Sequence, residues 1–210
     1  MSRGRLILTN FIGIIVVLAL IIGGAYYYYQ SQNYVKTDEA KVQADMTQVV
    51  APANGKLTEW NIKEGDEVSK DSVVGKIAGE QSGSVTATNE GTVIQSNTHA
   101  NQLVQQGQVL AQVADLKSMY ITANIEETDL KDIDEGDKVD VVVDGDSGTT
   151  YEGRVEKIGY ATNSALSMMP SQSTSGNYTK VTQKVAVKIS IKNPSDKIKP
   201  GMNASVKISL

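Results

Sequence analysis

The chain has 210 residues, a formal net charge of -4 and no cysteine. A chain of this length can hold one or two small domains besides a membrane segment. Its lysines and arginines are interspersed with acidic residues, which argues against nucleic-acid binding. The missing cysteines exclude disulfides, thiolate metal sites and a cysteine nucleophile. Eighteen glycines, with only one phenylalanine and one tryptophan, favour a β-rich, turn-rich protein with modest cores.

The first predicted element is a membrane-spanning helix at residues 6–29, which contain only two clearly polar side chains. About 20 apolar residues suffice to cross a bilayer core. The two arginines within residues 1–5 predict a cytoplasmic N-terminus and an extracytoplasmic remainder, and the tyrosines at 26–29 lie where an interfacial aromatic belt is expected. The alternative is a cleaved signal peptide with residues 23–25 as the processing site. Because the apolar segment is longer than a usual signal-peptide core, we expect an uncleaved anchor.

Residues 30–47 are polar and show poor alternation of apolar and polar side chains. We expect a stalk and a lead-in strand here, with residues 30–34 as the stalk and residues 37–50 as extended chain. The first folded module then occupies residues 48–115, and a second one occupies residues 116–210.

The first module contains one motif twice. Residues 49–57 are echoed by residues 85–93, and the offset of 36 continues to the end of the module. Gly55 and Gly91 are expected in turns that require a positive φ. Neither half can bury its apolar face alone, so the repeat predicts a small two-fold β-sandwich. A tight turn at residues 79–83 joins the halves.

The second module shows longer alternating strands, which predict a small antiparallel β-barrel. A short helical segment is expected within residues 126–133, and Gly136 and Gly201 mark turns. The expected strands are 119–125, 138–143, 151–158, 180–191 and 204–208.

One long loop is expected at residues 162–177, which are rich in Ser, Thr, Gly and Met. Loops of this length are commonly functional. Met168 and Met169 in this loop fit either of two roles, because methionine adapts to irregular apolar surfaces. They could contact a partner, or they could cover the end of the barrel.

No pattern predicts a catalytic, cofactor-binding or metal site. His99 is the only histidine and lies in a polar turn without a carboxylate cluster. The acidic residues at 129–137 lack the ligand order of an EF-hand. The Gly-Asp-Ser-Gly segment at 145–148 resembles the peptide around some catalytic serines, but it has no partner histidine and is interpreted as a hairpin turn.

Five short segments form an ordered set along the chain: residues 37–42, 51–55, 64–68, 125–130 and 199–202. Taken in order, they resemble the signatures of HlyD-type membrane fusion proteins, also called periplasmic adaptor proteins. Residues 169–170 and 175–187, which include Asn177 and Tyr178, resemble the EmrA-like branch in particular. The resemblance implies a lipoyl-like barrel-sandwich hybrid, a β-barrel, self-association into rings, and a partner exporter of the major-facilitator or ABC type in the same membrane.

One departure from the family pattern concerns the turn between the lipoyl-like halves. Members that reach an outer-membrane channel insert an α-helical hairpin there, and this chain has only residues 79–83. The resemblance therefore argues against docking onto an outer-membrane channel and favours a cell with a single membrane.

A lipoyl-like module also raises the alternative of a swinging-arm carrier, with lipoate or biotin on a lysine at the tip. The tip holds Glu80 and Gln81, and the nearest lysine, Lys76, falls within a predicted strand. A structural or sensing envelope protein is a third interpretation.

The sequence thus predicts a mainly β protein with an N-terminal membrane helix. The expected function is that of a non-enzymatic adaptor subunit in the export of drugs or small amphiphiles, without a cofactor. The candidate partner or substrate contacts are Met168, Met169, Asn177 and Tyr178.

Overall fold

The computed structural model describes residues 12–24, 33–79, 82–166 and 182–210. Residues 12–24 are helical. No helix within the described ranges combines the length and the apolar character that crossing a bilayer requires. Residues 6–11 and 25–29 of the predicted span lie outside the described residues.

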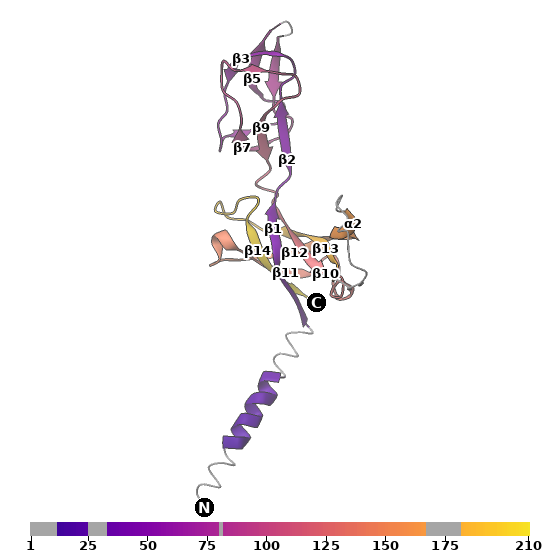
Figure 1. The fold of residues 1–210 in the computed structure, drawn as a ribbon. Helices are drawn as coiled ribbons and strands as arrows, with labels where there is room; N and C mark the ends of the chain where they lie inside the picture. Colours follow the sequence, from indigo (N-terminus) through magenta and orange to yellow (C-terminus); the bar gives the residue numbers. More distant parts are fainter. Residues whose placement is uncertain (1–11, 25–32, 80–81, 167–181) are drawn as a thin grey trace, which may run out of the picture.

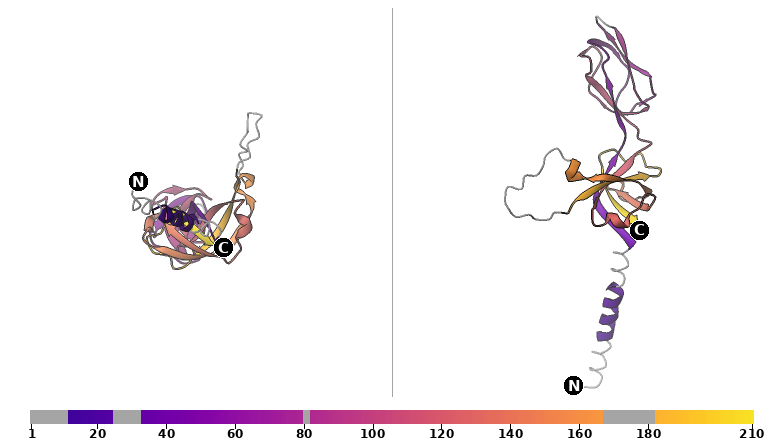
Figure 2. Two further views of the ribbon diagram at one scale, coloured as in Figure 1. Left: turned by 90° about the horizontal axis from the view of Figure 1, so that it is seen from below. Right: turned by 90° about the vertical axis from the view of Figure 1, so that its right-hand side faces the viewer.

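The described strands build two modules, a sandwich and a barrel, which lie end to end (Figures 1 and 2). The sandwich consists of two four-stranded antiparallel sheets with the orders β2-β9-β7-β4 and β6-β5-β3-β8. Its strands are β2 (Met46–Val50), β3 (Gly55–Trp60), β4 (Glu67–Val68), β5 (Val73–Ala78), β6 (Gly83–Thr86), β7 (Gly91–Ser96), β8 (Leu103–Val104) and β9 (Val109–Ala114).

The two sheets are related by the offset of 36 residues. When 36 is added to the residue numbers of β2 and β4, and subtracted from those of β9 and β7, the order β2-β9-β7-β4 becomes β6-β5-β3-β8. The pairing registers follow the same rule. Val50 pairs with Val109 in one sheet, and Thr86 pairs with Val73 in the other, each immediately after a β-bulge. The core follows the same rule, with Leu57 and its counterpart Val93 both at most 1% exposed. The predicted duplicated sandwich is therefore confirmed, and the structure adds that the β-bulges are duplicated as well.

Gly55 and Gly91 begin β3 and β7 instead of occupying turns. Gly91 has a φ of +154°, whereas Gly55 has no positive φ, so the expected turn geometry was wrong for Gly55. The physical reason for glycine is a close approach between strands. A Cβ atom at Gly55 would lie 2.5 Å from the Ala78 carbonyl oxygen, and one at Gly91 would lie 2.6 Å from the Ala114 carbonyl oxygen.

The barrel is closed and antiparallel, with the strand order β1-β10-β13-β12-β11-β14. Its core is filled by alternate side chains such as Ile121, Ile125 and Ile189, each at most 1% exposed. Gly136 and Gly201 lie in turns with φ values of +102° and +92°. The elements are β1 (Tyr34–Gln43), β10 (Tyr120–Glu126), η1 (Leu130–Asp132), β11 (Lys138–Val143), η2 (Asp144–Asp146), β12 (Thr150–Thr162), α2 (Asn163–Leu166), β13 (Lys184–Ile191) and β14 (Asn203–Ser209).

The segment expected to be a stalk and lead-in strand contains β1, which closes the barrel between β10 and β14. The register shifts between Thr37 and Ala40, at a β-bulge. Val35 points into the core before the bulge, and Ala40 and Val42 point into it afterwards. The bulge moves the buried positions from odd to even residue numbers, which explains the poor alternation in the sequence.

The long loop expected at 162–177 also differs at its start. β12 continues to Thr162, and residues 163–166 form α2. Residues 167–181 lie outside the described residues, so the contacts expected at Met168, Met169, Asn177 and Tyr178 do too.

Candidate functional site

The residues that the sequence analysis considered for a catalytic or metal site have ordinary structural roles. His99 is exposed in the turn before β8, where its backbone N–H donates to Gln102 Oε1. In the acidic segment, Asp137 Oδ2 accepts a hydrogen bond of 2.7 Å from the Asp134 backbone N–H and closes the turn at Gly136. Within the described ranges, no group of three or more His, Cys, Asp or Glu side chains could hold a metal ion.

The Gly-Asp-Ser-Gly segment connects β11 and β12, which pair with each other as a hairpin. Asp146 in this connection accepts a hydrogen bond of 2.6 Å from the Tyr151 hydroxyl and lies 3.2 Å from Ser195 Oγ and 3.3 Å from Lys197 Nζ. The hydrogen bond from Tyr151, above all, lowers the pKa of Asp146. The carboxylate therefore ties the hairpin to the loop between β13 and β14.

Lys76, the lysine nearest to the tip of the sandwich, lies in β5 and forms an ion pair of 3.0 Å with Glu59. Both side chains are about half exposed, so the pair adds little stability. A carrier lysine needs to lie on a projecting turn. The amine of Lys76 instead lies on the side of a strand.

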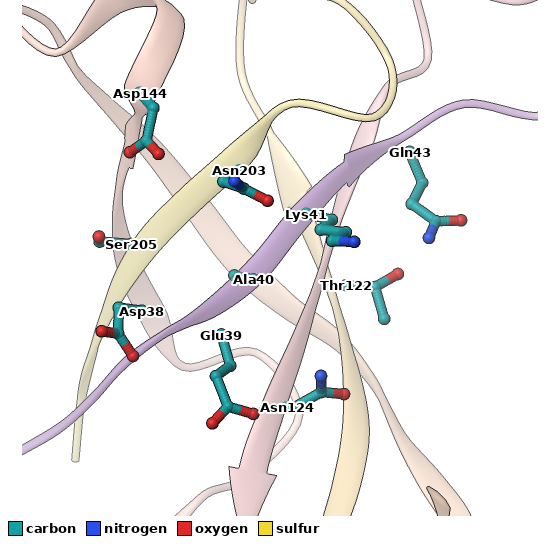
Figure 3. Close-up of a pocket in the computed structure, with 10 residues that line it drawn as sticks. All are labelled: Asp38, Glu39, Ala40, Lys41, Gln43, Thr122, Asn124, Asp144, Asn203 and Ser205. Carbon is teal, nitrogen blue, oxygen red and sulfur yellow. The ribbon is translucent and has the colours of Figure 1, made fainter.

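A polar hollow lies on the outer face of the barrel, where β1, β10 and β14 meet (Figure 3). Its volume is about 690 Å³. The bulge in β1 leaves two successive side chains, Asp38 and Glu39, exposed on this face. Glu39 pairs with Lys184 of β13, and this contact raises the pKa of the lysine. The lining residues are Asp38, Glu39, Ala40, Lys41, Gln43, Thr122, Asn124, Asp144, Asn203 and Ser205.

The end of β12 and α2 form a second exposed surface, next to the hollow. Asn163 Nδ2 donates a hydrogen bond of 2.9 Å to Asn124 Oδ1, and Ser164 bonds to Gln183, so α2 is fastened to β10 and to the start of β13. Three residues of β12 bulge out between Ile158 and Thr162 opposite one residue of β13.

Tyr160 sits on this bulge with 91% of its surface exposed, and Lys157 Nζ lies 5.1 Å from its ring centroid. Sequence reasoning missed Tyr160, because it ended the strand at Ile158. A tyrosine that follows Gly159 at the end of an alternating run was the available signal. Bulges often re-aim a side chain towards a functional surface.

The third surface is the base of the barrel, the end at which β1 begins and the chain ends. The Leu210 backbone N–H donates a hydrogen bond of 3.1 Å to the Asn33 carbonyl oxygen, which fixes both segments there. Lys207 Nζ lies 3.7 Å from the centroid of the Tyr34 ring. A hollow of about 450 Å³ at this end is lined by Tyr34, Val35, Lys36, Asp129, Lys131, Asp132 and Leu210.

The opposite end of the barrel forms the joint with the sandwich, which the chain crosses at 43–46 and again at 114–120. The Asp115 backbone N–H donates to the Asp45 carbonyl oxygen, and Ile94 and Leu116 pack against the barrel core. The Asp115 carboxylate accepts hydrogen bonds from the backbone N–H groups of Lys117 and Ser118. Hydrogen bonding, foremost from the Ser118 side chain, lowers the pKa of Asp115.

Comparison with known proteins places both modules. Residues 45–115 match the family described as "YhbJ, barrel-sandwich hybrid domain", and residues 119–208 match the "YknX-like beta-barrel domain". The chain is 63% identical over 209 residues to the "Putative efflux system component YhbJ" of Bacillus subtilis strain 168. That match covers 100% of this chain and 95% of the relative.

More distant relatives are longer proteins. The "Multidrug resistance protein MdtN" of Escherichia coli K12 is 34% identical over 115 residues, which cover 52% of this chain and 34% of MdtN. Among solved structures, the membrane fusion protein Spr0693 from Streptococcus pneumoniae R6 has a TM-score of 0.60 at 13% identity, with 83% of this chain and 97% of that chain covered. This last likeness shows the fold alone. Together with the full-length match to YhbJ, the observed modules show that the chain belongs to the family of membrane fusion proteins, or periplasmic adaptor proteins, in a short form without the α-helical hairpin between its lipoyl-like halves.

Proposed function

We propose that this chain is the membrane-anchored adaptor subunit of an efflux system, and that it acts by contact with an exporter in the same membrane and not by catalysis. The observation that carries the proposal is the match to YhbJ along the whole chain, since the name of that relative assigns it to an efflux system. The fold supports it, because the shared sandwich and barrel offer surfaces for contact.

An anchor at residues 6–29 is part of the proposal. The large apolar side chains of the helical residues 12–24 are between 51% and 71% exposed, so the folded modules do not cover them. A bilayer would remove this apolar surface from water. The arginines within residues 1–5 support a cytoplasmic N-terminus with both modules outside.

The anchor also determines which end of the barrel faces the membrane. Four residue steps separate Tyr29, the last residue of the proposed span, from Asn33, and an extended chain covers at most about 3.6 Å per residue. The base of the barrel therefore lies within roughly 14 Å of the end of the span. Asp129, Lys131 and Leu210 at this base are placed to meet an exporter first.

A second contact is proposed for the segment that follows α2. Met168, Met169, Asn177 and Tyr178 remain the candidate residues there. The support is indirect: α2, which precedes this segment in the chain, is fastened to β10, and Tyr160 at the end of β12 is exposed. Exposed methionine and tyrosine side chains are suited to protein contacts.

The test is co-purification of a multi-spanning exporter with the affinity-tagged full chain, combined with the drug sensitivity of cells that lack the chain. We expect an exporter of the major-facilitator or ABC type, and a homo-oligomer of the adaptor by cross-linking. The double variant Met168→Ser, Met169→Ser should lose exporter, whereas Leu103→Ser, at a residue 78% exposed on the sandwich, should retain it. Unchanged sensitivity without any co-purifying exporter would refute the proposal and favour a structural or sensing protein.

The topology has its own test, because the chain contains no cysteine to interfere with labelling. Leu103→Cys should react on intact cells with a membrane-impermeant maleimide, and Ser2→Cys should react only after the cells are opened. Labelling of Ser2→Cys on intact cells, or removal of residues 1–25 from the mature protein, would exclude the anchor.

A further inference from the structure

The joint between sandwich and barrel leaves an open crevice of about 420 Å³. Its wall is mainly apolar and combines three parts of the chain, the edge of the sandwich, the crossing segment and the loop before β14. Pockets between structural units are common sites for small molecules, and this volume lies within the usual range. The lining residues are Met46, Glu64, Gly65, Thr92, Val93, Ile94, Leu116, Lys199 and Pro200.

The internal duplication shows that this apolar lining is not a requirement of the sandwich fold. The offset of 36 places Ser82 at the position of Met46 and Thr58 at the position of Ile94. The sheet that contains β3 and β5 forms the tip, the end of the sandwich away from the barrel (Figure 1). Thr58 lies in β3, Ser82 directly precedes β6 of the same sheet, and both residues are exposed. The copy at the joint is therefore apolar for a local reason.

Contact with the barrel explains only part of this apolar character. Ile94 and Leu116 do pack against the barrel core, but Met46 remains 51% exposed beside the crevice. A flexible, exposed methionine at the mouth of an apolar crevice is suited to a ligand of variable shape.

The charges at the crevice specify the ligand further. Glu64 Oε1 already accepts a hydrogen bond of 3.1 Å from the Ser96 backbone N–H. Lys199 lies on the other side, and its ammonium group forms no ion pair within the part of the chain that the structure describes. An available cation beside an apolar surface favours an anionic head group with an apolar tail.

We propose that this crevice binds a free single-chain amphiphile with a carboxylate head group, with its chain against Met46, Ile94 and Leu116 and its carboxylate at Lys199. The site would give the adaptor a ligand of its own, in addition to its contacts with an exporter.

The fluorescence of Trp60, the only tryptophan of the chain, can report binding. Two hydrogen bonds connect its side chain, through Ser96, to Glu64 in the wall of the crevice. Trp60 Nε1 donates to Ser96 Oγ at 3.1 Å, and the Ser96 backbone N–H donates to Glu64. The full chain in phosphatidylcholine vesicles is titrated with dodecanoate, and with dodecyltrimethylammonium as the cationic counterpart. We expect a saturable change in Trp60 emission with dodecanoate at lower concentrations than with the cation.

Matched variants locate the site. Ile94→Thr introduces the residue of the tip and should weaken dodecanoate binding roughly fourfold or more, because two carbon atoms of apolar contact are lost. Thr58→Ile makes the reverse change at the tip and should leave binding unchanged. Lys199→Gln should weaken dodecanoate roughly two- to fivefold without weakening the cation. Met46→Ser, at a half-exposed residue, repeats the test of the apolar wall without disturbing the packed joint.

A linear change in Trp60 emission without saturation, or the same affinity for dodecanoate in all four variants, would overturn the proposal in favour of simple partition of dodecanoate into the vesicles. A response to phosphatidylglycerol vesicles alone would assign the crevice to membrane lipid and would overturn it too. A second copy of the chain or another protein as the occupant would leave Trp60 silent to dodecanoate. Since the titration uses the isolated chain, its failure leaves the adaptor proposal standing.

Discussion

Val42 provides a test of whether the segment after the anchor is a strand of the barrel. Val42 is 1% exposed within the barrel core, and the truncation Val42→Ala removes two buried carbon groups. The lost transfer free energy is about 1.6 kcal/mol, at about 0.8 kcal/mol per group. A residual void of roughly 50 Å³ adds about 1 kcal/mol. We therefore expect the barrel to lose about 2 to 3 kcal/mol of its free energy of unfolding.

For a module of about 100 residues, this loss lowers the Tm by roughly 10 to 20 °C. Thermal unfolding followed by circular dichroism measures the effect, and Trp60 emission reports separately on the sandwich. Lys41→Ala is the matched control, since Lys41 is exposed on the same strand and its loss should cost under about 0.5 kcal/mol. If Val42→Ala shifted the transition no further than Lys41→Ala does, β1 would not be part of the barrel core and the argument from its bulge would fail.

Three further changes follow from the contacts. Gly91→Ala should destabilise the sandwich by about 1 to 3 kcal/mol, because its Cβ atom would lie 2.6 Å from the Ala114 carbonyl oxygen; urea unfolding followed by Trp60 emission measures this. Gly83→Ala is the control and should be near neutral, since a Cβ atom there meets only an ordinary van der Waals contact. Because the pKa of Asp115 is lowered in the folded state, its hydrogen bonds stabilise the fold above about pH 4, and this stabilisation is lost as the pH falls further. Asp115→Asn should therefore lose less free energy of unfolding between pH 5 and about pH 3 than the unchanged chain does. Because Lys76 lies within β5 and pairs with Glu59, the intact mass should show no lipoyl or biotinyl adduct, and Lys76→Arg should leave export unchanged. An adduct on Lys76, or a loss of export in Lys76→Arg, would contradict this.

The sandwich could be predicted from the sequence because its information is present twice. A single half-motif of short strands is ambiguous, but the same spacing of Val49, Gly55 and Leu57 at Val85, Gly91 and Val93 leaves few alternatives. The same reasoning assigned Gly55 and Gly91 to turns, because a sequence shows where glycine is needed and not whether the cause is a positive φ or a neighbouring carbonyl group.

The place of β1 in the barrel and the surface around Tyr160 were missed for a common physical reason. Both contain β-bulges, which change the side of the strand that faces the core and so remove the alternation by which strands are recognised. The same bulges put Asp38, Glu39 and Tyr160 on the outside of the barrel. The positions at which the strand pattern fails are therefore those that supply the exposed candidate residues.

The two ends of the duplicated sandwich have different environments, because one end meets the barrel and the other does not. The side chains at equivalent positions of the two copies differ accordingly. The joint carries Met46 and Ile94 where the tip carries Ser82 and Thr58, so the apolar end is the one that meets the barrel. At the tip, residues 79–83 join the two halves of the sandwich. The residues that differ between the two copies thus place apolar side chains at the end opposite this turn. The partner contacts that we propose are therefore expected at the barrel and the joint, and not at the tip.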